Sequence, residues 1–229
     1  MRSILRTDPI ARDVMALCAA AVVVGLSFGA IASAAGVPLA QIMVMNAFVY
    51  AGGAQFLAVG LAGAGATAVA IIAAGLLLNA RHLPFGLAIG NEVLGASRWS
   101  RLFGSHVMTD ESVAFALAQE DPLRRRRAYW MTGIALFLTW NVAAFVGAVV
   151  GSALGDPDTF GIDAAFPAAL LALTLPSLKD RASTLVALGG AALALLSTPF
   201  LPAGLPVLVA LLALVLGRSS KLVPGRRSS

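Results

Sequence analysis

The chain has 229 residues, of which 59% are hydrophobic and only 12% are charged. Soluble domains usually carry about 25% charged residues, so the composition excludes an ordinary soluble protein and predicts an all-α integral membrane protein. The net charge of +5 does not indicate a nucleic-acid partner, because the arginines lie between apolar segments, as is typical of the cytoplasmic side of a membrane protein. We therefore expect one transmembrane domain over residues 1–229, embedded in a lipid bilayer.

The first expected span covers residues 14–35 and follows a basic N-terminus, residues 1–12, that we place in the cytoplasm. The segment resembles a signal peptide, but it is long enough to cross a bilayer, and the rest of the chain is just as apolar. We therefore expect it to remain as a membrane anchor. Gly25, Gly29 and Ser33 give it a face of small residues, which lets another helix approach closely.

The second expected span covers residues 39–61 and is interrupted in its middle by Gly52 and Gly53. Glycine weakens a helix by about 1 kcal/mol relative to alanine, and Asn46 and Gln55 bring polar groups to the same region. Two interpretations stay open. The segment is either a discontinuous helix that lines a binding site or a helix that crosses a neighbour closely through its glycines.

A third apolar segment, residues 67–78, leads into a polar stretch with Asn79, Arg81 and His82. Charged side chains next to apolar sequence are costly in a bilayer and are therefore functional candidates, although in a wet loop they would only mark the membrane surface. Pro84 removes a backbone hydrogen bond and disfavours helical geometry in the residue before it. We expect Asn79, Arg81 and His82 to lie at a helix break or at a helix end.

After an interfacial stretch, the sequence suits a half-helix whose N-terminus is directed into the protein. Thr109 or Asp110 would cap it, and Glu111 would place a second carboxylate in its first turn, where negative charge is favourable. On a continuous helix His106 and Asp110 would lie one turn apart on the same face. Whether residues 103–119 cross the membrane or re-enter it stays open.

Four consecutive arginines, residues 124–127, form the strongest cytoplasmic marker in the chain. Further spans are expected over residues 128–154, 162–178, 183–198 and 206–216, followed by a basic cytoplasmic tail, residues 218–229. Because all basic segments are expected in the cytoplasm, an even number of crossings must separate each pair of them. We expect seven or eight transmembrane segments in total, some of them discontinuous. A re-entrant segment at residues 103–119 would satisfy this parity only if another segment were also broken. We expect a multi-pass protein of the cytoplasmic (inner) membrane with both termini inside.

A faint internal repeat relates the two halves of the chain. Residues 28–30 (FGA) resemble residues 146–148 (VGA), and each triplet precedes a glycine turn that leads into an apolar span with the pair AF, at residues 47–48 and 165–166. Transporter folds are often built from such repeats. Glycine and alanine are common in this chain, so duplication and coincidence both stay open.

Three short segments, taken in order, resemble the hallmark segments of the AzlC family, also called the branched-chain amino acid permease or LIV-E exporter family. They are residues 50–56 (YAGGAQF), 79–82 (NARH) and 109–111 (TDE), and the similarity extends from about residue 24 to about residue 196. The resemblance implies export of branched-chain amino acids and their toxic analogues, and a small, separately encoded membrane partner of the AzlD type. The sequence departs from the family with Ala54, where serine is usual, and with Asn79, where aspartate is common, which puts substrate identity in question.

We expect a secondary exporter of small apolar amino acids. Asp110 or Glu111 could accept the substrate ammonium, and Arg81 or exposed half-helix amides could bind its carboxylate. His82 could couple export to protons, or it could be a structural, hydrogen-bonded histidine. The expected substrate-binding residues are Asn46, Tyr50, Gly52, Gly53, Gln55, Asn79, Arg81, Thr109, Asp110 and Glu111, and we expect the residue 50–55 turn, Arg81 and Asp110 to meet at one cavity.

The alternative is a passive channel for small solutes, which broken helices and a repeat would also fit. A membrane-embedded metalloenzyme is disfavoured, because the chain has only two histidines and lacks the helical zinc motif of metalloproteases. We therefore expect no catalytic residues, no metal and no cofactor.

Overall fold

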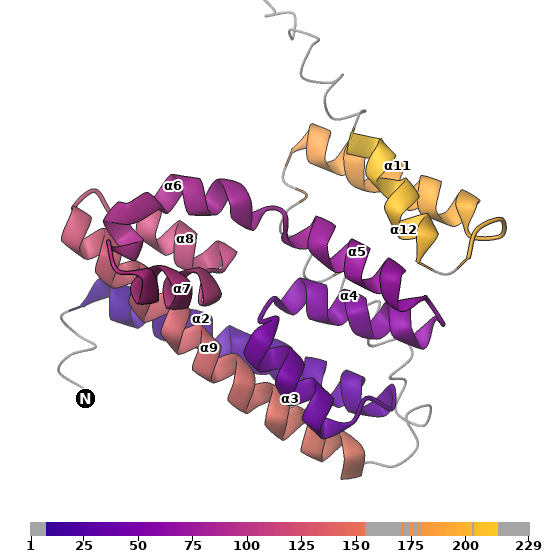
Figure 1. Cartoon of the computed structure of the whole chain (residues 1–229), viewed down its shortest axis with the longest axis horizontal. Helices are drawn as coiled ribbons and strands as arrows, with labels where there is room; N and C mark the ends of the chain where they lie inside the picture. The colour runs from indigo at the N-terminus through magenta and orange to yellow at the C-terminus, as the bar shows by residue number, and fades with distance from the viewer. Residues whose placement is uncertain are drawn as a thin grey trace, which may run out of the picture.

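The computed structural model describes residues 8–153, 171, 175, 178, 180–202 and 204–214. Within this part of the chain all regular structure is helical, which agrees with the all-α prediction (Figure 1). The helices are α2 (Pro9–Ala34), α3 (Leu39–Phe48), α4 (Gly52–Gly63), α5 (Ala68–Asn79), α6 (His82–Leu94), α7 (Arg98–His106), α8 (Asp110–Leu117), α9 (Pro122–Ala153), α11 (Arg181–Ser197), α12 (Leu205–Ala210) and the 3-10 helix η3 (Leu211–Ala213).

Two of the described helices, α2 and α9, are each long and apolar enough to cross a membrane. A third candidate span is the pair α5 and α6, which bends by 46° where the two helices join. The expected total of seven or eight spans stays a prediction, because most of the segment at residues 162–178 and the whole tail at residues 218–229 lie outside the described residues.

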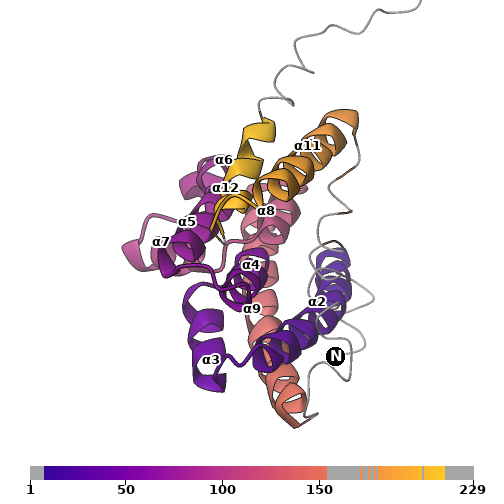
Figure 2. The ribbon, with the colours of Figure 1, turned by 90° about the vertical axis from the view of Figure 1, so that its right-hand side faces the viewer.

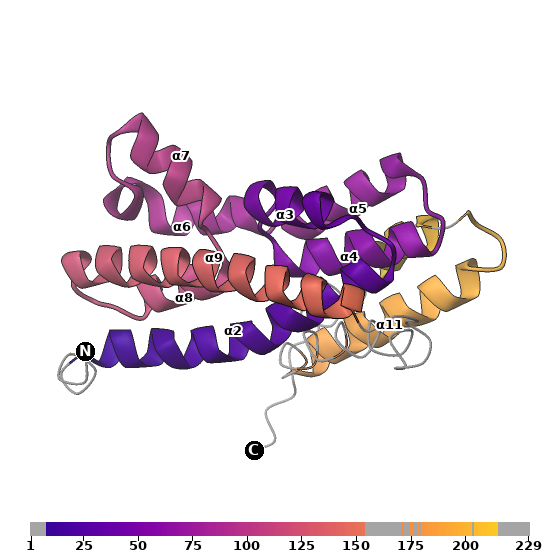
Figure 3. The ribbon, with the colours of Figure 1, turned by 90° about the horizontal axis from the view of Figure 1, so that it is seen from below.

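The helices α2 and α9 run side by side in the same direction and form the main helix pair of the structure (Figure 3). Glycines bring the two backbones together: a Cβ added to Gly29 would overlap the carbonyl oxygen of Ala144, and a Cβ added to Gly147 would overlap that of Leu26. Close packing replaces the hydrophobic drive between helices in lipid. The predicted small-residue face of the first span is therefore confirmed as a helix–helix contact.

These two contacts are reciprocal. Gly29 packs on Ala144 and Gly147 packs on Leu26, and the same sequence offset, 118, relates Gly29 to Gly147 and Leu26 to Ala144 (147 − 29 = 144 − 26). This offset also relates the similar triplets at residues 28–30 and 146–148. The reciprocity supports the predicted repeat, although its second part, at residues 165–166, lies outside the described residues.

The segment of residues 39–61 is not a single straight span, because the chain turns back between α3 and α4 (Figures 1 and 3). The turn contains Tyr50, whose φ of 38° lies in the left-handed region that side chains rarely adopt. At about 1.5 Å per residue, the 10 residues of α3 and the 12 residues of α4 each reach only part of the way across a bilayer core of about 30 Å.

A second reversal separates α7 from α8, and this hairpin starts at the opposite end of the α2–α9 pair (Figure 3). The helix α7 ends at His106 and α8 begins at Asp110, so the expectation that these two residues share one helical face is wrong. Each hairpin returns to the end of the α2–α9 pair from which it started. Neither hairpin therefore changes whether the number of crossings within residues 8–153 is even or odd.

The helices α11 and α12 pack on each other and form a small unit beside α5 (Figure 2). They meet the rest of the described chain near the start of α5, where a Cβ added to Gly204 would lie 2.8 Å from the Cβ of Ala70. The predicted span at residues 183–198 matches α11, whereas the predicted span at residues 206–216 is divided, over residues 206–213, between α12 and η3.

Candidate functional site

The tips of both hairpins and the bend between α5 and α6 meet at one cavity of about 350 Å³. The hairpin tips touch directly, since the ring of Tyr50 lies 6.2 Å from the ring of His106, centroid to centroid. The cavity is walled on its other sides by α2 and α9. Of the expected site residues, eight line it: Tyr50, Gly52, Gly53, Arg81, His82, Thr109, Asp110 and Glu111.

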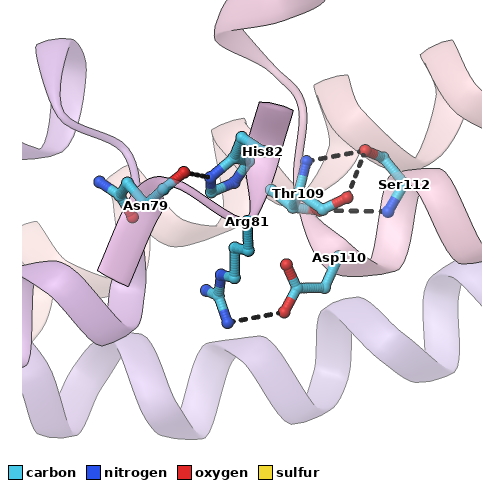
Figure 4. Close-up of polar contacts among 6 residues, drawn as sticks. All are labelled: Asn79, Arg81, His82, Thr109, Asp110 and Ser112. Atoms are coloured by element: carbon cyan, nitrogen blue, oxygen red, sulfur yellow. Dashed lines mark hydrogen bonds and ion pairs between the residues drawn. The ribbon is translucent and has the colours of Figure 1, made fainter. Parts of the chain in front are cut away.

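Arg81 and Asp110 form an ion pair in the cavity, with Nη1 of the arginine 2.9 Å from Oδ2 of the aspartate (Figure 4). Arg81 lies at the break after α5, and Asp110 is the first residue of α8. Both side chains are about two-fifths exposed, 41% and 43%, so the pair is reachable rather than sealed in the core. The second carboxylate oxygen of Asp110, Oδ1, is buried and has no hydrogen-bond partner among the described residues.

The N-terminus of α8 is capped by the chain itself. The Thr109 hydroxyl accepts a hydrogen bond from the Ser112 amide at 3.1 Å, and the Ser112 hydroxyl accepts one from the Thr109 amide at 2.9 Å (Figure 4). The predicted capping role of Thr109 is therefore confirmed. Because Asp110 and Glu111 add two carboxylates to this first turn, the end of α8 is suited to a cation and not to an anion.

The N-terminus of α4 has the opposite character. No side chain caps it, so its first amide N–H groups lack partners within the helix. Gly52 and Gly53 occupy this first turn and line the cavity, and the missing side chain of Gly52 makes room for the ring of Trp140, 3.0 Å from where a Cβ would lie. This end of α4 is therefore suited to an anion.

His82 begins α6 at the bend. Its Nδ1 lies 2.9 Å from the carbonyl oxygen of Asn79 (Figure 4), and because a carbonyl only accepts, Nδ1 must carry the hydrogen. This leaves Nε2 as the ring atom that can take up a proton.

Three expected site residues, Asn46, Gln55 and Asn79, do not line the cavity. Asn46 and Gln55 are fully buried, and Gln55 Nε2 donates to Asn46 Oδ1 at 2.6 Å. Since Asn46 lies on α3 and Gln55 on α4, this hydrogen bond joins the two arms of the hairpin behind its tip. The Asn79 carbonyl holds His82, as described above.

The sequence analysis missed the apolar wall of the cavity, of which Trp140 is the largest residue. Tryptophan is enriched at membrane interfaces, so its position in the middle of an expected span was an available signal. No sequence signal distinguishes the remaining wall residues from lipid-facing ones. They are Leu17, Ala20, Ala21, Val24 and Leu136.

Within the described part of the chain, no three His, Cys, Asp or Glu side chains gather closely enough to hold a metal ion. The arrangement is a cavity with a cationic and an anionic side chain next to each other, one uncapped helix N-terminus and an apolar wall. It can hold a small molecule that carries both charges and an apolar group.

A family model described as "AzlC protein" matches residues 16–154. The chain is 26% identical over 194 residues to an uncharacterized membrane protein of Helicobacter pylori strain J99, covering 84% of each chain. It is 26% identical over 157 residues to an uncharacterized membrane protein of Helicobacter pylori strain 26695, covering 68% of each. No solved structure matches the chain.

Proposed function

We propose that this chain, which belongs to the AzlC family of membrane proteins, exports small apolar amino acids, branched-chain ones above all, across the cytoplasmic membrane. The observation that carries the proposal is the Arg81–Asp110 pair in an apolar-walled cavity. A free amino acid at neutral pH carries one ammonium and one carboxylate on neighbouring atoms. A site that offers both complementary charges within 3 Å of each other matches this pattern.

In the proposed complex the ammonium binds Asp110 and Glu111 at the first turn of α8, where the helix end already carries two carboxylates. The carboxylate binds Arg81 and the open amides of α4. The apolar side chain lies against the wall formed by α2 and α9. Substrate would replace part of the Arg81–Asp110 contact, so both charges remain neutralised during transport.

The proposed orientation places the N-terminus, the turn between α8 and α9 and the C-terminus in the cytoplasm. An ion pair between Asp8 and Arg127 supports a common side for the first two, since it joins the start of α2 to the start of α9. We further propose seven or eight crossings and a small AzlD-type membrane subunit as partner. The chain acts as a transporter and not as an enzyme, and needs no cofactor.

His82 is the proposed proton-coupling residue, because it lines the cavity beside Arg81 and its Nε2 is not used in the hydrogen bond to Asn79. A proton on this nitrogen would add a positive charge that competes with the substrate ammonium in the cavity. Everted membrane vesicles distinguish coupled export from a passive channel. Uphill accumulation of leucine that an uncoupler abolishes supports the exporter, whereas simple equilibration supports the channel.

The cellular test uses resistance to a toxic leucine analogue. Asp110→Asn and Arg81→Ala should each abolish the resistance that the wild-type chain confers, at normal membrane levels of the protein. Glu92→Gln is the matched control, because Glu92 pairs with Arg125 at 3.6 Å but does not line the cavity, and it should retain resistance. Full resistance in both cavity variants would remove these two residues from the site.

A further inference from the structure

Trp140 lies in the middle of α9 and is only 9% exposed. Its ring stacks on Phe28 of α2, with centroids 5.7 Å apart and planes 24° from parallel, and it forms part of the cavity wall. Packing against Phe28 explains why an aromatic ring is favourable at position 140. It does not explain the indole N–H, which a phenylalanine at this position would lack.

The Nε1 atom of Trp140 is buried and has no hydrogen-bond partner among the described residues. Tryptophan N–H groups usually find a partner when they are buried, and leaving a buried donor unpaired costs about 1–3 kcal/mol. Trp130, the other tryptophan of α9, follows this rule, because its Nε1 donates to the carbonyl oxygen of Val93 at 3.2 Å.

The six-membered ring of Trp140 packs against the first turn of α4. A Cβ added to Gly52 would lie 3.0 Å from Cη2, 3.3 Å from Cζ2 and 3.5 Å from Cζ3. Trp140, with its unpaired indole N–H, and the first turn of α4, with its uncapped amides, therefore line the same cavity next to each other. All of these groups are donors, so their complement is an acceptor with several lone pairs.

We infer that Trp140 is a substrate-binding residue, and that its indole N–H, together with the amides at Gly52 and Gly53, binds a carboxylate. The inference rests on the proposed function and deepens it by naming a further hydrogen-bond donor for the substrate carboxylate. The carboxylate lies toward Trp140 and α4, and the ammonium lies toward Asp110 and Glu111. The stacked Phe28 ring holds the indole in place before the substrate arrives.

Leucine uptake into everted membrane vesicles tests this assignment with Trp140→Phe, which removes the N–H and keeps an aromatic ring. A hydrogen bond to a charged group is lost, so the apparent KM for leucine should rise about ten-fold or more. Isopentylamine, which is leucine without its carboxylate, should inhibit the variant and the wild type equally. Trp130→Phe is the matched control and should leave KM unchanged, because the N–H of Trp130 donates to the carbonyl oxygen of Val93.

An unchanged KM in Trp140→Phe, or an equal loss for leucine and isopentylamine, would overturn the assignment. To separate the N–H from ring shape, 3-benzothienylalanine at position 140 replaces the N–H by sulfur and keeps the bicyclic ring. It should raise KM as Trp140→Phe does, and wild-type KM with this analogue would also overturn the inference. Absence of leucine transport by the wild-type chain would instead reject the proposed function.

Discussion

The ionisable residues of the cavity come from elements that are distant in sequence. Arg81 belongs to the bend after α5 and Asp110 to the start of α8, yet they form an ion pair at 2.9 Å. Both could be singled out from the sequence, because a charge next to apolar segments is costly in lipid unless it has a function or a partner. Their pairing could not be predicted, since nothing in the local sequence specifies that the two breaks meet.

Asn46 and Gln55 show the limit of the same argument. Both are polar residues in an apolar segment, and the sequence analysis therefore included them in the binding site. The structure instead buries both completely and joins them by a hydrogen bond of 2.6 Å. A buried polar side chain that bonds to another side chain has the same sequence pattern as one that binds a ligand. The pairing is partial, since Gln55 Oε1 is buried and has no hydrogen-bond partner among the described residues.

This hydrogen bond should stabilise the α3–α4 hairpin rather than contact substrate. Asn46→Ala would leave Gln55 Nε2 without its acceptor, and we expect a loss of about 1–3 kcal/mol in the free energy of unfolding, read as a lower melting temperature of the purified protein. The exchange Asn46→Gln with Gln55→Asn keeps both amides and should recover much of the loss. Asn141→Ala is the control, because Asn141 Nδ2 donates to the Phe137 carbonyl of its own helix and joins no two helices among the described residues.

An equal loss of stability in the exchanged pair and in Asn46→Ala would show that the hydrogen bond is not the stabilising contact. A change in leucine KM at unchanged stability would return Asn46 to the binding site.

At the scale of the helices, the sequence located the breaks but not the direction of the chain after them. Gly52 and Gly53 indicated an interruption, and Thr109 a helix start, and both occur where expected. Composition does not distinguish a bent span from a hairpin, since both leave short apolar helices on either side of the break. The bend at α5–α6 and the reversals at α3–α4 and α7–α8 therefore became distinguishable only in three dimensions.

The two hairpins predict the sides on which four connections lie. In a Cys18→Ser background, single cysteines replace the exposed residues Ala35, Ala64, Ala96 and Glu120. Reaction with a membrane-impermeant maleimide in intact cells and in everted vesicles should place Ala35 and Ala64 on one side and Ala96 and Glu120 on the other. Ala35 and Ala64 on opposite sides would mean that residues 39–61 cross the membrane.

At the scale of the whole molecule, the α2–α9 pair is the frame on which the other described elements are arranged. Its glycines set a close, reciprocal contact, α9 packs against α3, α6 and α8, and both of its helices contribute to the cavity wall. Membrane class, helical fold and family could be predicted from composition and three short segments. The cavity could not, because it is formed by non-local contacts between breaks.

Direct binding of leucine to the purified protein is the measurement that tests the account most directly. Radiolabelled leucine should bind the wild-type chain saturably in nanodiscs, and Arg81→Ala and Asp110→Asn should each weaken binding about ten-fold or more, because a charged partner of the substrate is lost. Glu92→Gln should bind as the wild type does. Leucine binding that is undetectable in the wild type, or undiminished in both cavity variants, would contradict the account.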